Sequence, residues 1–97
     1  MAEEKKSIQL ELDNETSKGA YTNAAIIFHN ENEFVLDFAF IHPSKAKIVS
    51  RVISSPGHAK KMLKALADNI TQYENKFGKI KEIEGPDKGL NIKLSSN

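Results

Sequence analysis

The sequence contains no cysteine, which excludes a disulfide framework, a zinc site built on thiolates and a cysteine nucleophile. It has no apolar run long enough to span a bilayer, so a membrane-spanning helix is also excluded. The first twelve residues, MAEEKKSIQLEL, lack the apolar core of a signal peptide, and we therefore expect a cytoplasmic location. An excess of one charge is missing too, because 14 basic and 13 acidic residues leave a net charge of +1. This balance does not indicate a general binder of polyanions.

What remains is typical of one small soluble domain. The 97 residues fit a single domain, with an expected ordered core over about 8–80 and a tail from 81. A chain of this size buries only about 60–65% of the surface that its unfolded form exposes, so its core is thin. Charge is segregated along the chain, since 1–37 carries eight acidic and three basic residues whereas 38–81 carries nine basic and two acidic ones.

Apolar residues recur with the period of a β-strand in the first half of the chain. We predict strands over 8–12, 21–29, 33–41 and 46–54, with a loop over 13–19. A turn centred on Ser44 joins the last two strands. In an antiparallel pair with that turn, residues whose numbers add to 88 face each other.

From Ser55 the apolar period changes to 3.6, the period of a helix. Ser55 is a good N-cap, Pro56 suits the first helical position, and Gly78 suits the C-terminal cap. A helix of about 22 residues is roughly 33 Å long, enough to lie along a nine-residue strand of roughly 30 Å. Its apolar stripe consists of Ala59, Met62, Leu63, Leu66, Ile70, Tyr73 and Phe77. We expect the stripe to pack on the sheet, with Leu66 and Phe38 in contact at its centre.

The predicted fold class is therefore α+β. It consists of a four-stranded, meander-like antiparallel sheet followed by one long C-terminal helix packed on one face, with flexible tails. Beyond the helix, Ile92 and Leu94 suit a short edge strand, a segment that docks on a partner, or a disordered tail.

The second face of this sheet is apolar, although the sequence has no further long helix to cover it. The candidate interface there consists of Val35, Asp37, Ala39, Ile41, Val49, Arg51 and Ile53. The strand over 21–29 adds either Ala25 and Ile27, or Ala24, Ile26 and Phe28. An uncovered apolar patch of this kind usually marks an interface, so we predict a homo-oligomer, a dimer or a larger assembly. The alternative is that the tails of the same chain close this face.

Asp37 and Arg51 are expected directly opposite each other on this second face. Such a cross-strand ion pair either fixes the register of a sheet or contributes specificity to an interface. The spacing alone leaves both interpretations open.

No residue pattern indicates a catalytic or cofactor site. His29, His42 and His58 lack metal-ligand spacing, the glycines occur singly, and no base is patterned beside a serine. We therefore expect no cofactor, no metal ion and no enzymatic activity.

The basic residues of 38–81 form two groups that offer a contact to an acidic partner such as nucleic acid. The candidate basic patch consists of Lys45, Lys47, Lys60, Lys61 and Lys64, extended by Arg51. For Lys60, Lys61 and Lys64 a solvated helix face is the more usual interpretation. No aromatic residue interleaves them, so a stacking platform for single strands is not indicated, and nucleic acid ranks second as a partner.

An ordered set of short motifs also runs through the chain. In order they are 19–23 (GAYTN), 33–38 (EFVLDF), Pro43, 50–52 (SRV), 55–60 (SPGHAK), Leu66, Asn69, 73–74 (YE) and 77–80 (FGKI). Their order and spacing resemble the prokaryotic family known as domain of unknown function 3467, over about 8–80. The resemblance implies no catalytic residue, because that family has no established activity. In layout alone, four antiparallel strands followed by a long helix also resemble the SecB export chaperone, which is oligomeric and cytoplasmic.

These features lead to two hypotheses on function. The first is a non-enzymatic, oligomeric protein-interaction module, whose chaperone-like variant holds apolar segments on the second face or in a groove beside the helix. The alternative is a nucleic-acid-associated accessory protein that uses the basic patch.

Overall fold

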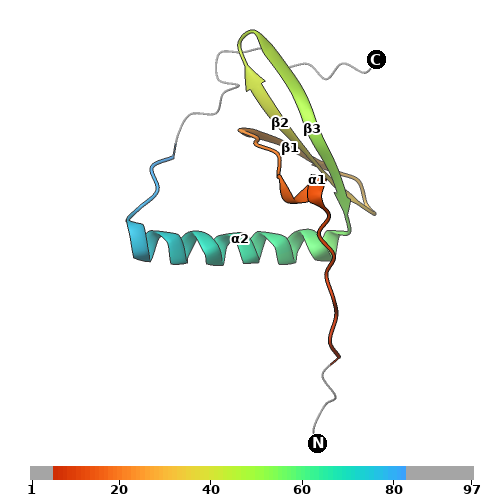
Figure 1. The fold of residues 1–97 in the computed structure, drawn as a ribbon, viewed down its shortest axis with the longest axis vertical. Coiled ribbons are helices and arrows are strands. Elements are labelled where there is room, and N and C mark those ends of the chain that lie inside the picture. The colour runs from red at the N-terminus through yellow and green to blue at the C-terminus, as the bar shows by residue number, and fades with distance from the viewer. Residues whose placement is uncertain (1–5, 83–97) are drawn as a thin grey trace, which may run out of the picture.

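The computed structural model describes residues 6–82, which form one sheet and two helices. Helix α1 (Asn14–Ser17) is followed by β1 (Ala24–His29), β2 (Phe34–His42), β3 (Lys45–Ser54) and helix α2 (Pro56–Phe77). The strands lie in the order β1-β2-β3, and both neighbouring pairs are antiparallel. Figure 1 shows α2 leaving the end of β3. The predicted α+β class is confirmed. The predictions for Ile92 and Leu94 lie outside the described residues.

The fourth strand predicted over 8–12 is not seen. Ile8, Leu10 and Leu12 are 84%, 94% and 69% exposed, and residues 8–12 do not form a strand. Alternation of apolar and polar residues selects a face, but a strand also needs a neighbour for its backbone N–H and C=O groups. No strand within 6–82 pairs with this segment, so the sheet described there has three strands.

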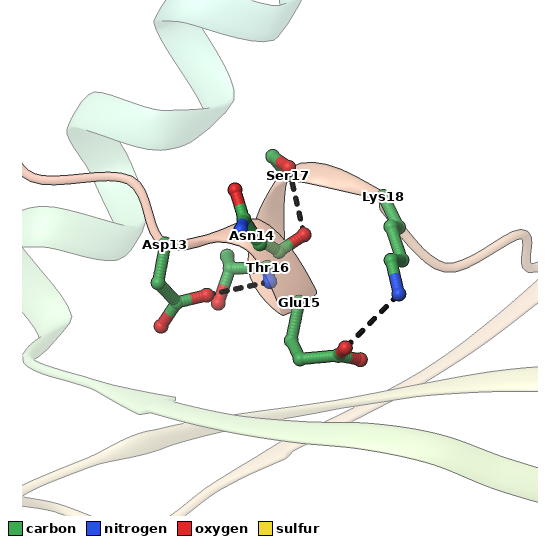
Figure 2. A network of polar contacts seen from close by, with 6 residues as sticks. All are labelled: Asp13, Asn14, Glu15, Thr16, Ser17 and Lys18. Atoms are coloured by element: carbon green, nitrogen blue, oxygen red, sulfur yellow. Dashed lines mark hydrogen bonds and ion pairs between the residues drawn. The ribbon is translucent and has the colours of Figure 1, made fainter.

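The predicted loop over 13–19 contains the one-turn helix α1, which is held by contacts within the segment (Figure 2). Oδ1 of the N-cap residue Asp13 accepts a 2.7 Å hydrogen bond from the backbone N–H of Thr16. This hydrogen bond lowers the pKa of the Asp13 carboxyl. Nζ of Lys18 donates to Oε1 of Glu15 at 3.0 Å. All four residues are exposed, so the network shapes the approach to β1 rather than forming a site.

The register of β2 and β3 follows the prediction over half of the hairpin. Asp37 faces Arg51, as numbers adding to 88 require. Nearer the turn the register shifts by one, so that Ala39 faces Ile48. The prediction that Val49 faces Ala39 is therefore wrong.

The cause of this shift is the length of the turn. His42 faces Lys45, so only Pro43 and Ser44 lie between the two strands, whereas a turn centred on Ser44 requires an odd number of residues. A β-bulge next to Phe38 absorbs the difference by giving β3 one extra residue. Beyond the bulge the predicted pairing is restored.

The predicted limits of the long helix are confirmed. The hydroxyl of Ser55 accepts a 3.1 Å hydrogen bond from the backbone N–H of His58, and Pro56 begins the helix. The N–H of Gly78 donates to the carbonyl oxygen of Glu74 at 2.9 Å. Gly78 has a φ of 97°, a conformation that side-chain-bearing residues rarely adopt, which explains glycine at this cap.

The predicted packing of α2 along the sheet is wrong for most of the helix. Figure 1 shows α2 running away from the sheet, and only its first turns approach the strands. Leu66 is 60% exposed, so the buried contact predicted between Leu66 and Phe38 is not formed. Only Ser55 separates β3 from α2, and a helix that turns back over its sheet usually needs a connection of about 2–6 residues.

The apolar core within one chain is small as a result. Among the described residues, the buried apolar side chains are Ala39 and Ile41, both on the central strand β2. The strands and α2 leave large hydrophobic side chains exposed on both faces of the sheet and along the helix. The apolar surface buried within one chain is therefore much smaller than the amount that normally offsets the conformational entropy lost on folding.

Candidate functional site

The best-defined polar contact of the sheet joins Asp37 of β2 to Arg51 of β3 on the second face. Nε and Nη2 of Arg51 donate to Oδ1 and Oδ2 of Asp37, both at 2.7 Å. The side chain of Asp37 is 1% exposed and that of Arg51 is 48% exposed. Two parallel hydrogen bonds of this kind hold the planar groups in one relative orientation. The pairing predicted from the sequence is thus confirmed, and its geometry suits a device that fixes register.

The electrostatics of this pair keep both partners charged. The hydrogen bonds from Arg51 lower the pKa of the Asp37 carboxyl and outweigh its desolvation, and the positive charge of Arg51 acts in the same direction. The same hydrogen bonds raise the pKa of Arg51. The guanidinium also lies over the ring of Phe28 in β1, 5.8 Å from its centroid. Arg51 therefore links all three strands on one face.

At one end of the candidate interface, called the closed end, Ala39 and Ile41 are buried by the same chain. Ala39 and Ile41 are 2% and 6% exposed, so they offer no surface to a partner of this conformation. Asn23 extends β1 at this end, because its Nδ2 donates to the carbonyl oxygen of Ile41 at 3.0 Å and its Oδ1 accepts from the N–H of Ile41 at 2.9 Å. The backbone N–H of Asn23 also donates to the carbonyl oxygen of Ala39.

The other end of the second face is open. Ile53 is 56% exposed, whereas Val35 and Val49 are half-buried. Of the two alternatives for β1, Ile26 and Phe28 lie on this face, since they stand opposite Asp37 and Val35. They are 37% and 43% exposed. The accessible part of the candidate interface therefore lies around Ile53 and includes two residues that the predicted set lacked.

The opposite face of the sheet, called the first face, carries Phe34 and Leu36 and contributes a groove of 520 Å³ between the sheet and the start of α2. Its walls are Ile27, Phe34 and Leu36 from the sheet, and Pro56, Ala59, Lys60, Met62, Leu63 and Leu66 from the helix. Within this lining, Lys60 supplies the one charged group. An apolar segment fits such a surface, whereas a polar ligand would meet few hydrogen-bond partners. The helical stripe predicted most of the helical wall from the sequence. The predicted ends of the strand and the helix also leave only Ser55 between them, and this short connection is the signal that could have indicated an open groove.

The predicted basic patch is divided between distant places. Lys45 and Lys47 lie at the turn end of β3, while Lys60, Lys61 and Lys64 lie on α2 beyond the other end of that strand (Figure 1). A ten-residue strand spans roughly 33 Å, so one chain does not bring the two groups together.

One contact at the junction of β3 and α2 was not expected from the sequence. Oγ of Ser54 lies 2.6 Å from Nδ1 of His58. A serine–histidine pair that performs acyl transfer also needs an orienting partner on the other ring nitrogen and donors for an oxyanion. Within 6–82 the ring of His58 makes no further hydrogen bond, so the contact is one part of the helix cap. The Ser-Ser-Pro sequence with histidine two residues later is the signal that could have indicated it.

Residues 6–82 contain neither a metal-binding cluster nor a membrane-spanning helix. No group of three His, Asp or Glu side chains in that range is placed to hold a metal ion. No helix in the same range combines the length and apolar character needed to cross a bilayer.

An α+β protein with an open apolar groove is thus the class that the fold and the surfaces define. The family model described as "Protein of unknown function (DUF3467)" matches residues 1–82, and the chain belongs to this family. The resemblance seen in the sequence motifs is therefore confirmed. Neither the comparison with curated proteins nor that with solved structures gave a match. The likeness to the SecB chaperone is not shown, because no comparison supports it and the described sheet has three of the four strands on which it rested.

Proposed function

We propose that this chain functions as a non-enzymatic, oligomeric protein-interaction module. The observation that carries the proposal is the apolar surface of α2, where Leu63, Leu66 and Phe77 are 67%, 60% and 66% exposed. Exposed apolar side chains that occur singly are ordinary, but a continuous stripe next to an apolar groove is typical of a surface that binds protein. The small core of the single chain supports the same proposal, because a partner would supply the missing burial.

The chemistry of the groove favours protein binding over catalysis. Enzyme pockets usually combine an apolar wall with several converging polar groups. The groove beside α2 has one amine, that of Lys60, within an otherwise apolar lining. In the chaperone-like form of the proposal, this groove holds apolar segments of unfolded chains.

Nucleic-acid binding is the weaker candidate, because no observation on the described residues favours it. The lysines of the basic patch lie in two separate groups, and Arg51 is engaged by Asp37.

The oligomeric part of the proposal is tested by measuring the mass of the full chain in solution by light scattering at micromolar concentration. We expect at least twice the chain mass of 10.8 kDa. Ile70→Glu places a charge on the apolar stripe and should reduce the mass, whereas Asn75→Glu, on the opposite side of the same helix, should not. The mass of one chain for the unaltered protein would contradict the proposal.

The chaperone-like form needs a separate test with a defined aggregating protein. Reduced insulin is suitable, since light scattering follows the aggregation of its B chain. We expect the protein to delay aggregation, Leu63→Glu to remove the effect, and Asn75→Glu to retain it. No delay with the unaltered chain would refute the chaperone-like form and leave the oligomeric module in place.

A further inference from the structure

The apolar stripe of α2 contains a regular seam. Its members are Ala59, Leu63, Leu66, Ile70, Tyr73 and Phe77, which follow one another at intervals of four, three, four, three and four residues. This alternation is the a/d pattern of helices that pack side by side along their length. From Leu63 onward the seam side chains are 41–67% exposed, so no helix within residues 6–82 faces them.

The residues of the seam match each other in size when two copies of the helix lie antiparallel. Around position 68, Leu66 corresponds to Ile70, Leu63 to Tyr73 and Ala59 to Phe77. When two such helices lie antiparallel, each d position meets an a position, and here the smallest side chain meets a large aromatic one. Alternation of small and large residues across an interface is what close packing requires.

We infer that the partner of α2 is the α2 of a second copy of this chain, in an antiparallel pair with a two-fold axis beside position 68. This inference rests on the proposed function and names the partner of that module. The second copy's helix lies in the open space between α2 and the first sheet face, where the groove is lined by Phe34 and Leu36. A contact of this kind is isologous, so the same surface of both copies is buried.

Charge along the seam agrees with this arrangement. Lys60 and Glu74 lie on the same flank of α2, and they are nearly equidistant from position 68 in opposite directions. The antiparallel pair therefore brings Lys60 of one copy toward Glu74 of the other, twice around the axis. Lys64, Asp68 and Asn75 lie on the side of α2 opposite the seam and remain in solvent.

The area available is sufficient for a stable dimer. Eight large side chains of α2 and the first face are 39–67% exposed: Ile27, Phe40, Val52, Leu63, Leu66, Ile70, Tyr73 and Phe77. With about 150–200 Å² for each fully exposed side chain, they offer roughly 600–850 Å² of apolar surface per copy. A standard interface buries about 800 Å² per partner with polar groups included. A second copy is thus sufficient to cover the seam without a further protein.

The absence of cysteine makes disulfide cross-linking a clean test in the full chain. Ala59→Cys and Phe77→Cys chains are prepared separately, mixed, allowed to exchange and mildly oxidised. The two positions are about 27 Å apart on one helix, far beyond the roughly 7 Å between Cα atoms that a disulfide tolerates. Each chain carries one cysteine, so any disulfide joins two copies, and a bond between these two positions requires the helices to lie antiparallel. The matched control mixes Ala59→Cys with Asn75→Cys, which lies opposite the seam.

We expect the first mixture to shift from the one-chain band to a band of twice the mass on a non-reducing gel, while the control remains at one chain. Leu63→Cys mixed with Tyr73→Cys should give the same shift and guards against a loss of folding caused by removing Phe77. If the unaltered protein has the mass of two or more chains but neither seam mixture cross-links, the helix pair is overturned and the oligomeric module stands. A one-chain mass would overturn both. Bonding of Ala59→Cys to Leu94→Cys within one chain would assign the groove to the C-terminal segment and also overturn the inference.

Discussion

Removing the amide of Asn23 should loosen the closed end of the sheet. Asn23 makes two hydrogen bonds to the backbone of Ile41, at 2.9 and 3.0 Å, and no other side chain of the described chain pairs with that backbone. Each bond contributes about 0.5–1.5 kcal/mol net, so Asn23→Ala should lower the free energy of unfolding by about 1–3 kcal/mol. The upper part of this range applies if water does not reach the N–H of Ile41, whose side chain is 6% exposed.

Urea unfolding followed by circular dichroism at one fixed protein concentration measures this loss. The matched control is Asn75→Ala, which removes the same side chain from the solvent side of α2. Hydrogen exchange adds a local readout, because the amide of Ile41 should exchange faster in Asn23→Ala. Unchanged exchange at Ile41, together with a loss below about 0.5 kcal/mol, would refute the reasoning that Asn23 extends the sheet.

Three further outcomes are expected. Because the pKa of Asp37 is lowered in the folded protein, its contribution to stability is complete above its unfolded pKa near 4 and is lost as the pH falls through the folded value. Asp37→Asn should therefore flatten the pH dependence of urea unfolding below about pH 4, and parallel curves for variant and wild type would contradict this. Ser55→Ala should lower the free energy of unfolding by about 0.5–2 kcal/mol through loss of the N-cap, and Ser55→Asp should retain most of it in the same urea assay. Duplex DNA should bind weakly in a fluorescence titration near physiological salt; sub-micromolar affinity with a steep salt slope that flattens in Lys60→Ala would reverse the ranking of the two functions.

The parts of the fold that depend on local chemistry were predictable from the sequence. Ser55, Pro56 and Gly78 define both ends of α2 because each acts through its own backbone conformation or a nearby N–H group. The pairing of Asp37 with Arg51 was predictable because alternation and one turn position determine which residues of a hairpin meet.

The remaining features depend on contacts between distant segments or on small geometric choices. The segment 8–12 has the alternation of a strand, but no local pattern shows whether another strand lies beside it. The two-residue turn and the bulge next to Phe38 change the register by one. Pro43 marks the turn but does not fix its length, and no residue pattern marks the bulge. Asn23 was predicted to be part of a strand, whereas its side-chain amide makes the two hydrogen bonds to Ile41 that the backbone of a paired strand residue would make.

The position of β3 in the sheet has a consequence for the behaviour of the chain at high concentration. β3 is an edge strand of the sheet described, and its sequence over 48–54 is rich in β-branched residues. Such edges are templates for open-ended association between chains. Lys45 and Lys47 place positive charges near the turn end of this edge, and the bulge twists it, both of which oppose the addition of another strand. Arg51 is the one charged residue within 48–54, and Asp37 holds its guanidinium over the inner strands. A neutral residue in its place would remove the register device and leave 48–54 an uncharged segment at the sheet edge, which is a known cause of aggregation.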